Sequence, residues 1–131
     1  MLIKRSNYRY SWWPDGSTEE NPVGGFDLFD DGPKRPLSLW SFGIFEEKNR
    51  GNGYGQQMLS EAIAMAENRD IELFVMTSNK IAIHVYEKAG FEVVGAPSKS
   101  AYTWRMVRKA TKSTSINDDM NRRVLERESI C

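Results

Sequence analysis

The stretch Arg50-Gly51-Asn52-Gly53-Tyr54-Gly55 lies where a strand pattern gives way to a helix pattern, and the rest of the sequence is organised around it. Its three glycines remove the Cβ atoms of alternate residues, and the first amides of a helix have no intrahelical acceptor. Those amides stand at the positive end of the helix dipole, so an anion can approach them closely. Arg50 adds a positive charge beside them. The stretch therefore predicts a binding site for a phosphate or pyrophosphate group.

Other interpretations of these glycines fit the sequence less well. A hairpin at Asn52-Gly53 would need flanking residues that alternate in polarity, and these do not. A nucleotide-hydrolase phosphate loop needs Gly-Lys-Ser or Gly-Lys-Thr, which does not occur in the sequence. A dinucleotide-binding fingerprint needs a third glycine where the chain has Gln56. A glycine-rich connection that binds no ligand is the alternative that the stretch alone leaves open.

The apolar pattern around the stretch predicts an α+β (mixed α/β) fold. Before it, residues 8–13, 25–29 and 37–45 read as antiparallel strands, and the prolines and glycines between them leave no room for a helix. After it, apolar residues recur at helical spacing over 53–67. The nearly continuous apolar run 71–77 then predicts a strand buried on both faces and parallel to 37–45.

The remaining pattern completes a β-α-β-α-β-β unit with a central mixed sheet. A second helix is expected over 79–89, ended by Gly90 in a left-handed conformation. Its apolar stripe holds Ile81, Val85 and Ala89. Two strands, 91–94 and 101–107, follow it.

Length and composition favour one domain, which we place at residues 1–108. The polar tail 109–131 has an amphipathic pattern carrying Ile116, Met120 and Val124, so it is either mobile or docks on a partner. Eighteen basic and eighteen acidic residues create no broad field for nucleic acid or an anionic membrane. No apolar run approaches the roughly 20 residues that span a bilayer, and no signal peptide is recognisable, so we expect a cytoplasmic protein.

Metal and thiol chemistry are not expected from this sequence. Cys131 is its only cysteine and His84 its only histidine, which gives neither a disulfide nor a typical metal site. His84 is two residues from Tyr86 and faces another side of the second helix, so we expect it at the surface or in packing. The aromatic residues of the first strand could stack on nucleobases, but they more often pack a sheet, and nucleic acid is disfavoured.

A second motif follows the first, and each lies at a predicted junction of strand and helix. Asn79-x-x-Ala82-x-x-x-Tyr86-x-x-x-Gly90-Phe91 comes after Arg50-x-x-Gly53-x-Gly55. Together they resemble the GNAT superfamily of acyl-CoA N-acyltransferases over residues 37–107. The resemblance implies the GNAT fold and an N-acetyltransferase, which transfers acetyl from acetyl-CoA to a primary amine by direct attack in a ternary complex.

The resemblance also implies which residues bind the cofactor. Arg50–Gly55 resembles the loop that binds the pyrophosphate, and Gln56 continues it into the helix. Ile44 and Phe45 fall where the family's strand bulges, so that its backbone groups bond the pantetheine arm and the thioester carbonyl. Asn79 matches a residue that commonly bonds the pantetheine portion.

Tyr86 matches the family's general acid, which protonates the departing thiolate. The residues support this role independently, because Asn79, Ala82 and Tyr86 share one face of the predicted helix and Ala82 leaves room beside the phenol. A phenol of pKa about 10 is close enough to an alkyl thiol of about 8.5 to exchange a proton while staying protonated at pH 7. Without the motif, a tyrosine that merely packs would be the better interpretation.

The acceptor amine and its general base stay open. Some family members use a glutamate in the strand before the loop, but residues 37–43 contain no carboxylate. The weak candidates are Ser41, a chain of waters held by Ser38, Ser41 and backbone carbonyls, and Asp27 on the neighbouring strand. A protein lysine, a protein N-terminus and a small-molecule amine all remain candidate acceptors.

The region before Gly24 is shorter than the resemblance implies, because most members have a strand and two helices there that help to form the acceptor pocket. We therefore expect an open acceptor side, which either suits a protein substrate or is completed by the tail or by a second subunit in a homodimer. The alternative is a non-catalytic GNAT-fold protein that acts by binding a macromolecular partner.

Overall fold

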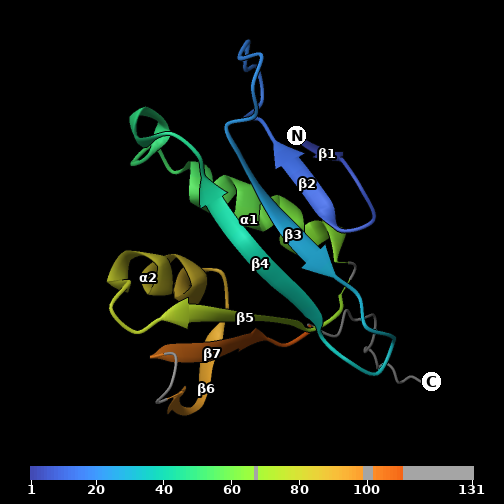
Figure 1. The fold of residues 1–131 in the computed structure, drawn as a ribbon, viewed down its shortest axis with the longest axis vertical. Helices are drawn as coiled ribbons and strands as arrows, with labels where there is room; N and C mark the ends of the chain where they lie inside the picture. The colour runs from blue at the N-terminus through green and yellow to red at the C-terminus, as the bar shows by residue number, and fades with distance from the viewer. Residues whose placement is uncertain (67, 99–101, 111–131) are drawn as a thin grey trace, which may run out of the picture.

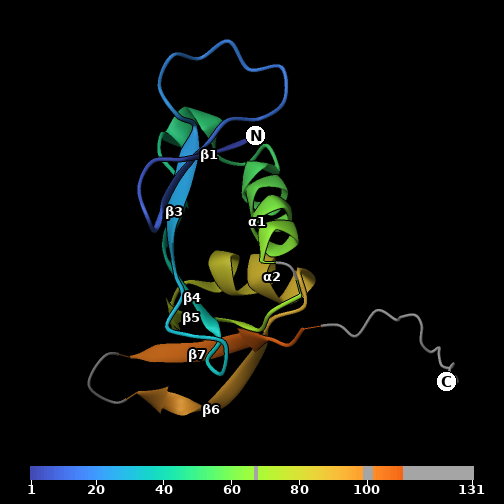
Figure 2. The same ribbon diagram turned by 90° about the vertical axis from the view of Figure 1, so that its right-hand side faces the viewer.

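The computed structural model describes residues 1–66, 68–98 and 102–110. It contains one mixed seven-stranded sheet in the order β1-β2-β3-β4-β5-β7-β6, with both α-helices on one side of it (Figures 1 and 2). The predicted α+β fold is confirmed. The predicted tail helix at Ile116, Met120 and Val124 lies outside the described residues, as does Cys131.

Four antiparallel strands form the first part of the sheet. They are β1 (Leu2–Lys4), β2 (Arg9–Trp12), β3 (Gly24–Phe29) and β4 (Leu37–Ile44). The last three confirm the predicted meander, whereas β1 was not predicted. A tight turn over residues 5–8 joins β1 to β2, so the shortening of this region lies in the connection between two strands, where no helix is present.

Helix α1 (Tyr54–Met65) covers this antiparallel part. Its apolar stripe is buried as predicted, with Met58 and Leu59 fully buried and Ala62 at 1% exposure. Trp12 of β2 is also fully buried. Its Nε1 donates to Glu61 Oε2 at 2.7 Å, so burial of the indole leaves no unpaired hydrogen-bond donor. These contacts attach the helix to the sheet and hold the start of α1 beside the end of β4.

Strand β5 (Ile71–Met76) runs parallel to β4, as predicted, but only over a short stretch. Pairing joins Leu37–Leu39 to Ile71–Leu73, and beyond it the two strands diverge (Figure 1). The prediction that this strand is buried on both faces is wrong. Phe74 is 44% and Met76 50% exposed, because none of the described segments forms a second layer over the face on which they lie.

Helix α2 (Lys80–Lys88) ends at a Schellman motif. Gly90 has φ +99° and its N–H donates to the Glu87 carbonyl at 3.0 Å, while the Phe91 N–H donates to the Tyr86 carbonyl at 3.0 Å. The predicted left-handed stop is confirmed. The predicted apolar stripe is wrong for Ile81, which is 81% exposed, whereas Val85 and Ala89 pack against the core.

Strands β6 (Glu92–Ser98) and β7 (Thr103–Arg108) close the sheet, with β7 between β5 and β6. The predicted start of the last strand at Ala101 lies outside the described residues. Within those described, no helix has the length and apolar character needed to cross a membrane.

Candidate active site

A cleft of about 600 Å³ opens where the end of β4, the start of α1 and one side of α2 meet. Most of the predicted site residues line it. These are Ile44, Arg50, Gly51, Gly53, Tyr54, Gly55, Gln56, Asn79 and Tyr86. Phe45 and Asn52 are not part of the lining, whereas Phe42 and Gly43, which the sequence did not single out, are.

The glycine-rich stretch forms one end of the cleft. A single 3₁₀ turn, η1 (Glu47–Asn49), leads into it, and Gly53 begins α1 as an N-cap residue with φ +78° and no side-chain cap. Gln57 is the first residue of the helix whose N–H has an intrahelical acceptor, the Gly53 carbonyl at 3.1 Å. The amides of residues 54–56 therefore remain as donors at the positive end of the helix dipole.

Arg50 is held at the same end of the cleft. Its Nε donates to the Ile44 carbonyl at 3.2 Å, which ties the guanidinium to the last residue of β4. A fixed cation beside uncapped helix amides is a suitable arrangement for a pyrophosphate.

Strand β4 bulges before it reaches this loop. Gly25 pairs with Gly43 and Asp27 with Trp40, so one extra residue lies on β4, and Ser41 there has φ +55°. The expectation that the bulge falls at residues 44 and 45 is therefore wrong.

Phe45 lies on the other side of the sheet from the cleft. Its N–H donates to the Val23 carbonyl at 2.9 Å, so this amide is already used. A Cβ built on Gly25 would come within 3.0 Å of the Phe45 ring, whereas one built on Gly24 would meet Met58 of α1. Since neighbouring strand residues face opposite ways, the ring covers the face away from α1.

Helix α2 forms the second wall of the cleft. Asn79 caps it, since its Oδ1 accepts from the Ala82 N–H at 3.2 Å, and Asn79, Ala82 and Tyr86 face the cleft together as predicted. The exposed Ile81 stands at the mouth of the cleft. His84 is exposed and outside the lining, in agreement with its predicted surface position.

Tyr86 occupies the inner end of this wall and is 8% exposed. Its ring contacts Phe42 of β4 and Phe91 after the helix, with centroid distances of 5.8 Å in each case. The Schellman motif thus places Phe91 against Tyr86, which explains why Gly90-Phe91 accompanies the tyrosine in the motif. Burial raises the pKa of Tyr86 to about 12, so the hydroxyl is protonated at neutral pH.

Gln56 links the glycine-rich end of the cleft to the Tyr86 wall. Its Nε2 donates to the Val85 carbonyl at 2.9 Å. That carbonyl is available because the Ala89 N–H bonds to Tyr86 instead. No sequence pattern predicts this bond, since it joins a side chain to a backbone carbonyl 29 residues away.

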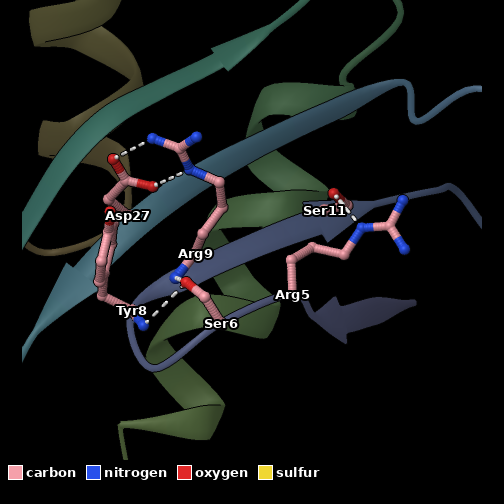
Figure 3. A network of polar contacts seen from close by, with 6 residues as sticks. All are labelled: Arg5, Ser6, Tyr8, Arg9, Ser11 and Asp27. Carbon is pink, nitrogen blue, oxygen red and sulfur yellow. Dashed lines mark hydrogen bonds and ion pairs between the residues drawn. The ribbon is translucent and has the colours of Figure 1, made fainter.

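The candidates for a general base do not face the cleft. Its lining contains no Asp, Glu or His among the described residues. Asp27 accepts from Arg9 at 3.0 and 3.3 Å, and Figure 3 shows this pair in front of the strands with α1 behind them. Ser38 donates to Glu72 at 3.3 Å, and Ser41 is exposed.

Residues 2–91 match the Acetyltransferase (GNAT) family. The chain belongs to this family. A comparison with curated proteins gives no match.

Solved structures agree with this GNAT assignment at the level of the fold. PH1933 from Pyrococcus horikoshii OT3 is 23% identical with a TM-score of 0.63, over 73% of this chain and 63% of that one. Ard1 from Thermoplasma volcanium is 21% identical with a TM-score of 0.60, over 70% and 66%. A Bacillus subtilis acetyltransferase in complex with CoA is 16% identical with a TM-score of 0.61, over 79% and 76%. The chain thus spans somewhat less than two thirds of the first two proteins.

Proposed function

We propose that this GNAT domain is an N-acetyltransferase that transfers acetyl from acetyl-CoA to a primary amine. The observation that carries the proposal is the cleft itself, which joins the uncapped start of α1 to the buried hydroxyl of Tyr86. One end offers donors for a phosphate and the other a protonated acid, as an acyl-CoA reaction requires.

The residues present fit acetyl-CoA. Arg50 and the amides of residues 54–56 would hold the pyrophosphate. The small side chain of Ala82 and the apolar side chains of Ile44 and Ile81 would accept the slender pantetheine arm. The Bacillus subtilis acetyltransferase of the same fold is in complex with CoA, which supports this ligand.

Acetyl-CoA supplies an acetyl group activated as a thioester. Tyr86 would donate its phenolic proton to the departing thiolate. The burial that raises the pKa of Tyr86 to about 12 widens the gap to an ordinary thiol pKa of about 8.5, but it also disfavours the charged thiolate beside the phenol and so assists the transfer. The described lining offers no cysteine, serine or carboxylate as a nucleophile, so we infer direct transfer to the amine without a covalent intermediate on the protein. A cytoplasmic location and a domain boundary at residue 108 stay predictions.

Two variants test the proposal. Arg50→Glu should weaken acetyl-CoA binding by about tenfold or more in calorimetry, since it places like charge beside the pyrophosphate. Tyr86→Phe should lower the rate of transfer by about 10²-fold or more while leaving that affinity nearly unchanged. His84→Ala, outside the cleft on the same helix, is the matched control.

The outcomes separate the enzyme from its alternative. Failure to bind acetyl-CoA at millimolar concentration would reject the cofactor. Binding without transfer to any amine would instead favour a non-catalytic GNAT-fold protein that acts through a macromolecular partner. An unchanged rate in Tyr86→Phe would remove Tyr86 from the mechanism.

A further inference from the structure

The face of the sheet opposite the helices carries exposed aromatic and apolar side chains. Trp40 is 48%, Phe74 44% and Met76 50% exposed. Trp40 and Phe74 lie on neighbouring strands with ring centroids 5.8 Å apart. No segment within residues 1–66, 68–98 and 102–110 covers this group, which we call the aromatic platform (Trp40, Phe74 and Met76). A platform of this kind is typical of a binding surface.

The aromatic platform lies where the acceptor would reach the cleft. The last pair between β4 and β5 is Leu39 with Leu73, so Trp40 and Phe74 are the first residues beyond it and flank the opening between the strands. Two residues after Trp40, Phe42 contacts Tyr86 at a centroid distance of 5.8 Å. The platform on one face therefore lies only two residues along β4 from the inner end of the cleft on the other face.

The carboxylates beside the aromatic platform are already neutralised. Asp27 pairs with Trp40 across the strands and is bound by Arg9 at 3.0 Å. Glu72, two residues before Phe74, is bound by Arg105 at 2.6 Å. Polyamines and aminoglycosides are multiply charged cations whose recognition needs unpaired carboxylates. The platform offers apolar area instead of negative charge.

The absence of a base in the cleft points to the same class of acceptor. A lysine side chain has a pKa of about 10.4, whereas the α-amino group of a polypeptide has one of about 7.7–8.0. The neutral, nucleophilic fraction of an α-amine near pH 7 is therefore larger by a factor of roughly 300. An α-amine can lose its proton to water without a carboxylate in the protein.

We propose that the acceptor is the α-amino group of a polypeptide whose first side chains are apolar and lie on the aromatic platform. This inference rests on the proposed function. The α-ammonium group first loses one proton to solvent. The neutral nitrogen then forms the new C–N bond to the acetyl carbon as the C–S bond breaks, and it releases its second proton to water. Tyr86 protonates the thiolate and regains its proton from water, so the products are an Nα-acetylated polypeptide and CoA.

The experiment compares three acceptors and then four forms of the protein. A peptide with a free N-terminus that begins Met-Leu should have a kcat/KM at least about tenfold above that of spermidine. The kcat/KM of this first peptide should also be at least about tenfold above that of a peptide with a blocked N-terminus and one internal lysine. In Trp40→Ala and Phe74→Ser, the first peptide should bind the protein–CoA complex about tenfold more weakly in calorimetry, a measurement that involves no turnover.

Tyr8→Ala is the matched control, because Tyr8 is 39% exposed and stacks on Phe29 at 4.8 Å, beside Arg9 of β2 and two strands from Trp40. Its peptide affinity should stay within about twofold of the original. Preference for spermidine or the internal lysine, or an unchanged affinity in both platform variants, would overturn the inference. Tyr86-dependent transfer to those other amines would leave the proposed function intact, and absence of acetyl-CoA binding would reject both.

Discussion

The two faces of the sheet share the same strands but differ in what covers them and in which side chains they expose. On one face α1 and α2 bury the core and form the cleft, with backbone donors, a capped helix and a buried phenol arranged in sequence order. On the other face large side chains remain exposed, and the charges beside them are paired with each other. The covered face thus carries the stability and the proposed cofactor chemistry, whereas the bare face is available for recognition.

The largest expected effect comes from two neighbouring residues of β5 that face opposite ways. Leu73 is 2% exposed and Phe74 44%. Leu73→Ala should lower the free energy of unfolding by about 2–5 kcal/mol, because it leaves a cavity in the core. Phe74→Ala should lower it by less than about 1 kcal/mol. Urea unfolding measures both, and equal losses would show that a layer covers the second face in solution.

A smaller effect should follow when the two walls of the cleft are uncoupled. Gln56→Ala removes the bond to the Val85 carbonyl and should lower kcat/KM by about two- to tenfold, mostly in kcat, because Tyr86 is next to that carbonyl. The exposed Gln57 provides the control, and Gln57→Ala should leave both constants unchanged. A rise in KM alone would instead mean that Gln56 contacts the cofactor directly.

The smallest effect is a dependence of stability on alkaline pH. Burial raises the pKa of Tyr86 from about 10, its usual value, to about 12 in the folded protein, so its stabilising contribution is complete below pH 10 and is lost as pH rises from 10 to 12. From about pH 9 to pH 11, the original protein should lose about 1 kcal/mol more stability than Tyr86→Phe. Chemical unfolding at both pH values tests this, and parallel losses would mean that Tyr86 is solvated.

The covered face was largely predictable from the sequence. Periodicity located α1 and its buried residues Met58 and Leu59, and the two spaced motifs located the cleft because glycines, a cap and a tyrosine each impose a local requirement. Each of those requirements acts over a few neighbouring residues, so it leaves a pattern that can be recognised in the sequence alone.

The bare face was not predictable in the same way. An apolar run such as 71–77 predicts that its side chains are buried. It does not indicate whether a second layer covers Phe74 and Met76. The extra residue near Ser41 and the bond between Gln56 and Val85 depend on contacts between distant segments. Strand β1 is only three residues long and is defined by its partner β2.

The turn over residues 5–8 has a practical consequence for engineering. It joins two strands at an exposed site, where added chain length costs little, since each doubling of a loop adds only about 0.6 kcal/mol of closure entropy. A designed helical hairpin grafted there would lie next to the aromatic platform while leaving the cleft on the opposite face untouched. The domain could therefore serve as a scaffold in which acceptor choice is rebuilt by insertion and cofactor use is inherited unchanged.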